Sequence, residues 1–307
     1  MKIAIVKDAG CIDPAHFWST VWTNLCIEND IPYHVFDSDL ECFMRDIVSY
    51  KPDFTLWRSS HAPETKAKDV FQRQTLDKVM GFKIIPDWNM RYLYDNKVSQ
   101  TYLFQLFDIP HPETHIFFNK QDAEQYLRTA KYPFVVKANA GAGSKSFRFC
   151  ENYDGALKQL EENFTVGLAY SNRDFKEKGV FYAQEYIKLD GIWRIVMIGN
   201  DIGYSFYQSN RPGTLIASSQ GFDSYPPTPI ELLDLAADIN AKINWDYMMY
   251  DILYTPEKKP LVLEITDTCG YGHSSKRTIT HYKTHGEWVE KQSNATPAEL
   301  IFRKYIQ

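Results

Sequence analysis

Residues 134–149, with the sequence FVVKANAGAGSKSFRF, place a glycine-rich segment that carries a lysine between two strand-like runs. The segment does not match the nucleotide P-loop pattern GxxxxGK[ST], because Lys145 follows Ser144 and Asn139 stands where the first glycine belongs. A P-loop also opens a helix whose N-terminus binds phosphate, whereas the run that follows here is aromatic and alternating. The pattern therefore predicts two strands joined by a flexible loop.

The same segment departs from the dinucleotide-binding pattern GxGxxG, which requires three glycines. Gly141 and Gly143 fit the first two positions, but Ser146 occupies the third. Neither of the two common glycine-loop patterns explains this part of the chain.

The chain has 307 residues, which is long enough for two or three domains with a large shared core. Its net charge of −5 argues against a nucleic-acid groove or an anionic membrane surface as the main partner. No apolar run approaches the roughly 18 residues of a membrane span, and the start MKIAIVKDAG predicts a strand and not a signal peptide. We therefore expect no nucleic-acid partner and no membrane association.

The cysteines are odd in number, scattered and never spaced as CxxC. They are Cys11, Cys26, Cys42, Cys150 and Cys269. This usage predicts reduced thiols and a cytoplasmic location.

Strand and helix patterns alternate through residues 1–91. The strand-like runs KIAIV, YHVF, DFTLW and KIIP are separated by segments of helical length, including residues 14–29 and 63–80. This order predicts an open α/β domain with a parallel sheet and right-handed crossovers. Ligands of such sheets gather beyond the carboxyl ends of the strands, where Asp8 and Arg58 stand. Loop capping is the alternative role for both.

From residue 92 onward the pattern changes to α+β with mostly antiparallel strand pairs. A helix is expected over about residues 92–107, and strands bracket the glycine-rich segment. The sequence Gly199-Asn200-Asp201 between two strand patterns is a hairpin signal, and PEKKP joins YMMYDILY to LVLEIT.

Two lysines indicate a site for an anion. Lys137 lies inside the apolar run FVVKA, where burial of its charge requires a matching group, and Lys97 begins a helix. Together with a row of loop N–H groups, two lysines would neutralise a polyphosphate. An edge-strand lysine that extends to solvent is the alternative for Lys137.

The run YAQEYI places Gln184 and Glu185 just before the apolar pair Tyr186-Ile187. Apolar faces next to backbone and carboxylate groups suit an adenine ring.

Two acids stand inside apolar strand patterns near the C-terminus. Asp251 lies in YMMYDILY and Glu264 in LVLEIT, and a hairpin would bring both carboxylates to one face. Such a pair repels unless a cation binds between the two, and Mg²⁺ prefers oxygen ligands. Arg194 and Arg211, on the preceding hairpin and its exit, are candidates to contact a transferring phosphate. Solvent-facing acids are the alternative.

The order of these features resembles the ATP-grasp superfamily over residues 92–275, and residues 1–91 resemble the α/β domain that these enzymes usually carry. The segments YLYDNKVSQTYLFQLFDIPHPETHIFF, YPFVVKANAGAGS and YAQEYI resemble the ATP-grasp proteins of capsule and surface-polysaccharide pathways. They also resemble the ribosomal-protein glutamate ligase group.

The resemblance implies an N-terminal open parallel α/β domain (residues 1–91) followed by a two-subdomain ATP-grasp fold. Residues 92–183 would form a linker helix and a small subdomain with a phosphate lid, and residues 184–307 a subdomain with the Mg²⁺ site. The glycine-rich segment would be the lid, since its glycines let backbone close over a triphosphate.

The resemblance implies ATP and Mg²⁺ as cofactors. The residues implied to bind ATP are Lys97, Lys137, Gly141, Gly143, Ser144, Gln184, Glu185 and Ile187, with Asp190 as the candidate for the ribose. The implied metal ligands are Asp251 and Glu264.

One departure affects the metal site. Many relatives have Glu-x-Asn at the last metal position, whereas this chain reads Glu264-Ile265-Thr266-Asp267. Three interpretations stay open: Asp267 substitutes as a ligand, one metal binds more weakly, or water completes the site.

The function expected from the resemblance is an ATP-dependent carboxylate–amine ligase that works through an acyl phosphate. The partners would be small-molecule carboxylate and amine substrates, such as a sugar acid, an amino acid or a peptide, and a homodimer is compatible with the resemblance. A small-molecule kinase and a non-catalytic nucleotide-binding module are the alternatives.

His281 and His285 are four residues apart, so on a helix they would share a face near His273. Surface or substrate-side histidines are expected here in preference to a metal site.

Overall fold

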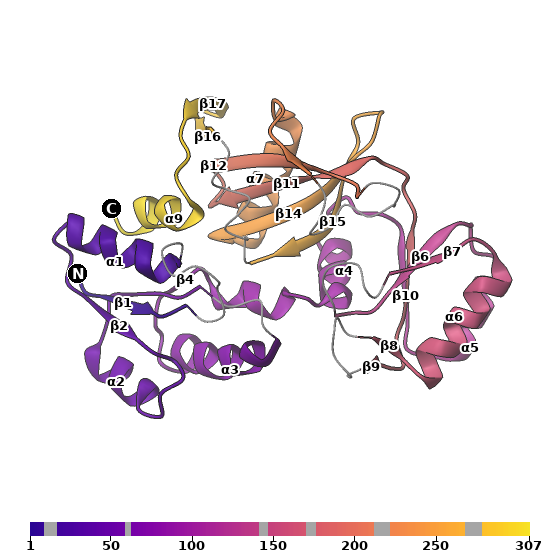
Figure 1. Ribbon diagram of the computed structural model, residues 1–307, viewed down its shortest axis with the longest axis horizontal. Helices are drawn as coiled ribbons and strands as arrows, with labels where there is room; N and C mark the ends of the chain where they lie inside the picture. Colours follow the sequence, from indigo (N-terminus) through magenta and orange to yellow (C-terminus); the bar gives the residue numbers. More distant parts are fainter. Residues whose placement is uncertain (9–16, 59–62, 141–146, 170–175, 212–221, 268–277) are drawn as a thin grey trace.

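Three sheets lie side by side along the long axis of the molecule (Figure 1). A parallel sheet built by the N-terminal residues is at one end, a large antiparallel sheet is in the middle, and a small antiparallel sheet is at the other end. The computed structural model describes residues 1–8, 17–58, 63–140, 147–169, 176–211, 222–267 and 278–307. The mixture of α/β and α+β layers confirms the predicted fold class.

The parallel sheet has the strand order β2-β1-β3-β4. Its strands are β1 (Ile3–Val6), β2 (Tyr33–Phe36), β3 (Phe54–Leu56) and β4 (Ile84–Ile85). The connecting helices are α1 (Trp18–Glu28), α2 (Phe43–Tyr50) and α3 (Pro63–Gln74), the last continuing as the π-helical segment η2 (Thr75–Val79). The predicted strand–helix alternation is confirmed.

Strand β1 is buried on both faces, as the central strand of a covered parallel sheet must be. Ile3 belongs to the apolar cluster that contains Trp22 of α1, whereas its neighbour Ala4 packs in the cluster of Phe43 from α2. Successive side chains of a strand point to opposite faces, so α1 and α2 cover opposite sides of the sheet.

The small sheet is antiparallel, with the order β5-β10-β6-β7. Its strands are β5 (Thr114–Phe117), β6 (Phe134–Lys137), β7 (Arg148–Cys150) and β10 (Phe181–Glu185), and a separate hairpin is formed by β8 (Leu168–Ala169) and β9 (Lys176–Glu177). Helices α5 (Lys120–Leu127) and α6 (Tyr153–Thr165) pack on one face. β6 and β7 pair directly, with Phe134 opposite Cys150, so the predicted strand–loop–strand unit is confirmed.

The large sheet has the order β15-β14-β11-β12-β16-β17, with β13 also paired to β12. Its strands are β11 (Gly191–Ile198), β12 (Ile202–Ser209), β13 (Asp223–Ser224), β14 (Tyr247–Tyr254), β15 (Pro260–Thr266), β16 (Ile279–Thr284) and β17 (Glu287–Gln292). Helix α7 (Ile230–Ile243) packs on this sheet, and α9 (Pro297–Tyr305) returns to the N-terminal sheet. The predicted hairpin at Gly199 is confirmed.

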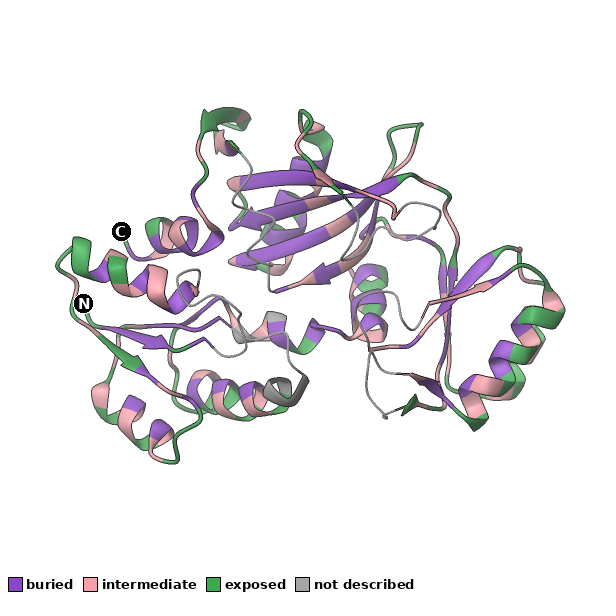
Figure 2. Ribbon diagram, in the orientation of Figure 1, coloured by how far each residue is buried: buried purple, intermediate pink, exposed green. Residues whose placement is uncertain are grey.

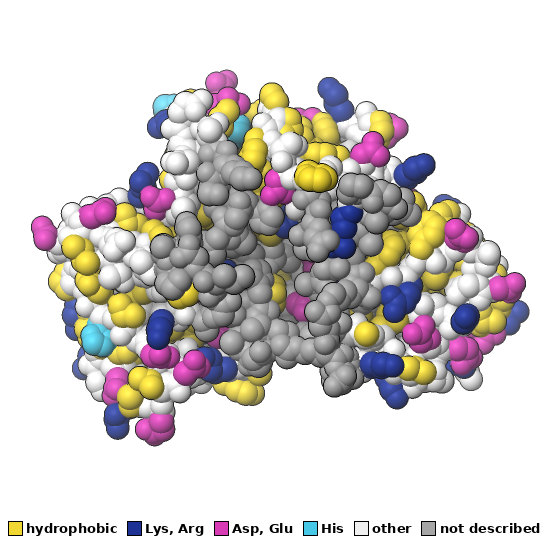
Figure 3. Space-filling model, in the orientation of Figure 1, with side chains coloured by type: hydrophobic (Ala, Val, Ile, Leu, Met, Phe, Trp, Pro, Cys, Tyr) yellow, Lys and Arg dark blue, Asp and Glu magenta, His cyan; other side chains and the backbone are white. Residues whose placement is uncertain are grey.

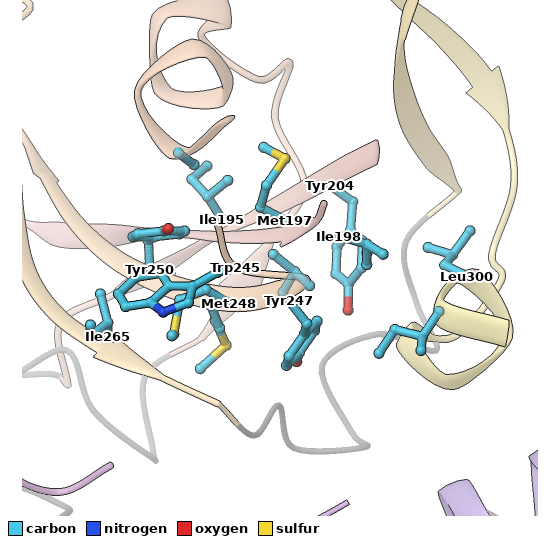
Figure 4. Packing of buried hydrophobic residues seen from close by; sticks show 14 of the residues in the cluster. Ile195, Met197, Ile198, Tyr204, Trp245, Tyr247, Met248, Tyr250, Ile265 and Leu300 are labelled. Atoms are coloured by element: carbon cyan, nitrogen blue, oxygen red, sulfur yellow. The ribbon is translucent and has the colours of Figure 1, made fainter. Parts of the chain in front are cut away.

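The main apolar core lies on the α7 face of the large sheet. Ile195 and Met197 of β11 and Tyr250 of β14 pack in one cluster that extends to Leu300 of α9 (Figure 4). The strand interiors are buried, whereas α2, α5 and α6 carry exposed residues on their outer sides (Figure 2). Basic and acidic side chains are interspersed over both ends of the face shown in Figure 3.

The helix expected over residues 92–107 is in fact broken. A 3₁₀ helix, η3 (Trp88–Leu93), is followed by α4 (Lys97–Leu106). Asp95 adopts a left-handed backbone with φ 51°, and the Asn96 side chain accepts a hydrogen bond from the Ser99 N–H at 3.2 Å. The break follows because a left-handed residue ends one helix and a capping asparagine starts the next. Lys97 nevertheless begins a helix, as predicted.

The C-terminal histidines do not share a helix face. His281 lies in β16, and His285 has φ 52° in the turn to β17. The hairpin forms because residues 279–292 alternate with the period of a strand around a turn at His285 and Gly286. His273 lies outside the described residues.

The predicted domain boundaries fall within elements of structure. The boundary at 91/92 lies within η3, and the boundary at 183/184 lies within β10. Among the described residues, no helix is long and apolar enough to cross a membrane.

Candidate active site

Two acids face each other across the edge of the large sheet. Asp251 of β14 is the direct cross-strand partner of Glu264 of β15, and the strand register shifts just after Asp251. Paired residues of antiparallel strands place their side chains on one face, and such irregularities re-aim neighbouring side chains. The expected pairing of these two acids is confirmed, and their role as metal ligands stays a prediction.

Arg194 extends this row of charges to a third strand. It lies on β11 directly opposite Asp251, and its Nη2 is 3.2 Å from Asp251 Oδ2. Both side chains are about six-sevenths buried, at 15% exposure each. An arginine on the same face as two acids is available to contact an anion bound beside them.

Lys97 approaches the acids from α4. Its Nζ lies 3.4 Å from Glu264 Oε1 and 3.9 Å from Asp95 Oδ1, and the lysine side chain is only 9% exposed. Burial alone would lower the pKa of Lys97, but the charges of Glu264 and Asp95 outweigh it and raise that pKa. Lys97 is therefore a stable cation at this site.

Lys137 comes from the small sheet. Its Nζ donates to Gln184 Oε1 at 2.6 Å. Burial lowers the pKa of Lys137 to about 8, with Lys97 acting in the same direction and Glu264 and Asp251 opposing both. A buried ammonium whose charged form is disfavoured would be stabilised by a bound anion.

Gln184 holds Lys137 from inside the small sheet. Its amide nitrogen donates to Thr114 Oγ1 at 3.0 Å and to the Tyr182 hydroxyl at 3.2 Å, while its oxygen accepts from Lys137. The Tyr182 hydroxyl in turn lies 2.9 Å from Thr101 Oγ1 on α4. The observed contacts of Gln184 thus tie Lys137 to β5 and to Tyr182, and its contact with nucleotide stays a prediction.

Glu185 is the last residue of β10, and Ile187 lies in the connection from β10 to the large sheet. Glu185 is exposed, and its backbone N–H donates to Glu113 O at 2.8 Å. Ile187 packs against the small cluster of Ile192, Leu253 and Leu261. Ile187 thus adds to an apolar surface close to the exposed Glu185, and the adenine contact of both residues stays a prediction.

The remaining predicted nucleotide and phosphate residues are Asp190, Arg211 and three residues of the glycine-rich segment. Asp190 accepts a backbone hydrogen bond from Asn210 N at 2.8 Å, and its charge adds to the effect of burial in raising the pKa of Tyr207. Arg211 is the last described residue before residues 212–221. The predicted ligands Gly141, Gly143 and Ser144 lie outside the described residues.

Asp267 stands against Arg91, a side chain with no solvent exposure. Asp267 Oδ1 is 3.4 Å from Arg91 Nη1, and Asp69 Oδ2 lies 3.6 Å from Arg91 Nε. Within the described ranges, no three His, Cys, Asp or Glu side chains gather as a metal site. The role of Asp267 as a further metal ligand stays a prediction, and its observed partner is Arg91.

Gln100 was not singled out in the sequence, yet it joins α4 to the strand of Glu264. Its amide nitrogen donates to Leu93 O at 2.8 Å and to Ile265 O at 2.9 Å, and its oxygen accepts from Ile265 N at 3.1 Å. A side-chain amide here makes both hydrogen bonds that a neighbouring strand would make. A glutamine in a helix carries no sequence signal for this role.

The polar residues at the strand ends of the parallel sheet contact other residues of the N-terminal domain. Asp8 accepts from the Trp18 N–H at 2.8 Å and from the Ser19 N–H at 3.3 Å, which caps α1. Arg58 Nη1 lies 3.8 Å from Asp8 Oδ2, and both side chains are buried. The capping alternative thus describes Asp8.

His281 lines a pocket away from Asp251 and Glu264. Its Nε2 lies 3.3 Å from Glu290 Oε1, and both residues line a pocket of about 140 Å³ with Ser205 and Thr228. Ser205 pairs with Ile195, next to the Arg194 position, so it points to the opposite face of the sheet. This pocket is separate from the row of acids.

Comparison with known proteins identifies the fold. No protein-family model matches the chain. The α-aminoadipate–LysW ligase LysX of Saccharolobus solfataricus is 24% identical over 261 residues, covering 79% of this chain and 92% of that protein. The RimK domain protein ATP-grasp from Sphaerobacter thermophilus matches with a TM-score of 0.55 and 15% identity, over 86% of this chain and 90% of that one. The chain has the ATP-grasp fold.

Another solved structure with a similar fold is D-alanine–D-alanine ligase from Bacillus anthracis, with a TM-score of 0.56, 14% identity and 88% of each chain covered. The same ligase complexed with ATP gives a TM-score of 0.55 at 14% identity, over 87% of this chain and 86% of that one. The predicted ATP-grasp resemblance is confirmed at the level of the fold.

Within this fold, five charged side chains from five elements converge. Lys97 comes from α4, Lys137 from β6, Arg194 from β11, Asp251 from β14 and Glu264 from β15. Direct ion pairs link Lys97 to Glu264 and Arg194 to Asp251. The charges of both acids also act on Lys137, where they partly oppose the lowering of its pKa by burial. The arrangement is a cationic and anionic site between the small and large sheets.

Proposed function

We propose that this protein is an ATP-dependent carboxylate–amine ligase that forms an amide through an acyl-phosphate intermediate. The observation that carries the proposal is the convergence of Lys97, Lys137 and Arg194 on the cross-strand pair Asp251 and Glu264. Three cations beside two carboxylates suit a polyphosphate that shares a divalent cation with the protein. The similar proteins LysX and D-alanine–D-alanine ligase are named as ligases, which supports the same class.

Mg²⁺ fits the donor set of the candidate site. Asp251 and Glu264 offer carboxylate oxygens on one face, and Mg²⁺ is usually held by one or two carboxylates plus substrate phosphates. When bound, the ion would neutralise charge on the phosphates. Asp251 and Glu264 would hold it, and Lys97, which lies beside Glu264, would contact phosphate oxygen.

The chain's own residues would perform the remaining tasks. Lys97 and Lys137 would bind the phosphates of ATP, and Arg194 would stabilise the phosphoryl group as it is transferred. A substrate carboxylate oxygen attacks the γ-phosphorus, the bond to the β-phosphate oxygen breaks, and ADP leaves. An amine nitrogen then attacks the acyl carbon, inorganic phosphate leaves with its electron pair, and the amine loses a proton.

The names of the similar proteins support a carboxylate and an amine as the two substrates. The name of LysX states that it joins α-aminoadipate to LysW, and that of D-alanine–D-alanine ligase states that it joins two amino acids. We propose an amino acid, a sugar acid or a peptide as the carboxylate substrate, with a small-molecule amine as its acceptor.

ADP release measured over a panel of carboxylates and amines tests the proposal. A ligase produces ADP only when its carboxylate is present, and addition of the amine accelerates the reaction. Hydroxylamine in place of the amine traps the acyl phosphate as a hydroxamate.

Other outcomes would contradict the ligase. A stable phosphorylated product with no hydroxamate and no amine dependence would establish a small-molecule kinase. Tight ATP binding with no ADP from any substrate pair would establish a non-catalytic nucleotide-binding module.

A further inference from the structure

Asn139 joins three elements at the end of β6, where the glycine-rich segment begins. Its backbone oxygen accepts from the Lys97 N–H at 3.0 Å, and its side-chain oxygen accepts from the Val98 N–H at 2.8 Å. Its own N–H donates to Glu177 Oε2 at 2.5 Å. One residue thus connects β6 to the first turn of α4 and to β9.

These contacts use the N-terminus of α4 inside the protein. Asn139 accepts hydrogen bonds from the N–H groups of Lys97 and Val98, and the Asn96 side chain accepts one from the Ser99 N–H. The first N–H groups of a helix are otherwise available to anions. Here these N–H groups bind Asn139 at the end of β6. The charge of a bound phosphate would therefore be neutralised by the lysine side chains and not by the helix N-terminus.

Glu177 is supported from α6. Asn163, which is 1% exposed, donates to Val180 O at 2.8 Å and accepts from the Gly179 N–H at 3.1 Å. Gly167 on the other side of this hairpin has φ +86°, and a Cβ there would lie 2.6 Å from Glu177 O. β8 and β9 are therefore closely packed next to α6, and Glu177 lies at the end of β9 where it accepts from the Asn139 N–H.

Glu177 is also within electrostatic reach of Lys97. Burial raises the pKa of Glu177, while the Asn139 N–H and the charge of Lys97 act in the opposite direction. The carboxylate is thus linked to the first turn of α4 by the hydrogen bonds of Asn139, and the positive charge of Lys97 favours its ionised form.

We propose that Asn139 and Glu177 are positioning residues that set the spacing between Lys97 and Lys137. Lys137 stands two residues before Asn139 on β6, and Lys97 is bonded to Asn139 through its backbone. With this connection in place, one ammonium group from α4 and one from the small sheet would meet the same polyphosphate. The inference rests on the proposed nucleotide-binding function, but it assigns residues that touch no nucleotide.

The test compares ADP with adenosine, because the two ligands differ only in phosphate. Binding of each is measured by calorimetry to the wild type, Glu177→Ala and Glu177→Gln. We expect Glu177→Ala to bind ADP about tenfold or more weakly, with adenosine affinity within about twofold of the wild type. Glu177→Gln should stay near the wild type, because its amide oxygen still accepts from the Asn139 N–H.

Two further variants make the test specific. Asn139→Ala removes the acceptor of the Val98 N–H and should also weaken ADP more than adenosine, so it serves if Glu177→Ala does not fold. Glu151→Ala changes an exposed glutamate just after β7 and should leave both affinities unchanged.

The contrary outcomes are distinct. Unchanged ADP affinity in Glu177→Ala overturns the positioning role, and so does an equal loss of ADP and adenosine, which would indicate a merely structural role. If the wild type binds ADP no more tightly than adenosine, the proposed phosphate site itself fails, and the positioning role fails with it.

Discussion

Lys97 Nζ lies 3.4 Å from Glu264 Oε1, so the first residue of α4 forms an ion pair with an acid of the large sheet. This contact joins a lysine expected to bind phosphate to a carboxylate expected to bind metal. Glu264 would hold the metal, and the ammonium of Lys97 beside it would contact a phosphate. The ion pair therefore keeps both charges compensated when no ligand is bound.

The acids should be essential for turnover. Asp251→Asn and Glu264→Gln should each reduce turnover by about 10²-fold or more, since each removes a charge that holds the metal at the transferred phosphate. Mn²⁺ binding followed by electron paramagnetic resonance should weaken in both variants. Glu287→Gln, at an exposed position of β17, is the control. Near-normal rates in either site variant would show that this pair is not the metal site.

Loss of Lys137 should weaken ATP binding and leave the fold intact. The variant Lys137→Ala removes a charge-assisted contact of about 1.5–3 kcal/mol, equivalent to about 10- to 150-fold in affinity. Calorimetric titration with ATP measures the change, and Lys131→Ala, at an exposed lysine just before β6, serves as the control. Unchanged ATP affinity would mean that Lys137 does not face the phosphates.

The affinity for ADP should depend on pH through the same lysine. The pKa of Lys137 is about 8, so the ammonium is present below pH 8 and is lost as the pH rises above it. A bound phosphate stabilises the charged form, so affinity should fall by up to about tenfold per pH unit above 8. The phosphate groups are already fully ionised at pH 8, because their second pKa is about 6. In Lys137→Met the fall above pH 8 should disappear, and a persistent fall would assign it to another group.

Gln100 should contribute to stability through the strand of Glu264. Gln100→Leu leaves the backbone oxygen and nitrogen of Ile265 without their partner, which costs about 1–3 kcal/mol for each buried group. Urea unfolding measures the loss, and Gln105→Leu on the exposed side of the same helix is the matched control. Equal stability of the two variants would contradict a bridging role for Gln100.

Asp267→Asn separates the two roles of this residue. As the partner of buried Arg91, Asp267 should contribute about 3 kcal/mol or less to the free energy of unfolding, because Asp69 also faces that arginine. As a metal ligand, it should instead change Mn²⁺ affinity. We expect the first effect to dominate, and a loss of Mn²⁺ affinity at unchanged stability would restore Asp267 as a ligand.

Local patterns in the sequence were sufficient for the elements and for several site residues. Period-two runs around Asp251 and Glu264 predicted both strands and their hairpin, because alternation and a turn signal are local properties. The strand–glycine–strand unit around Lys137 was predicted for the same reason. The hairpin at His281 was not, since a spacing of four residues also fits a helix face.

Which side chains meet at the site could not be predicted from the sequence. Only the tertiary packing places Asp267 against Arg91, which lies 176 positions earlier in the chain. The bonds of Asn139 to α4 and to Glu177 likewise join segments about 40 positions apart. Hydrogen bonds between distant segments depend on how sheets and helices pack, and uncharged side chains such as Gln100 and Asn139 carry no local pattern that marks them. The sequence by itself determined which strands, helices and charges the protein has, and the tertiary structure decided which of those charges meet.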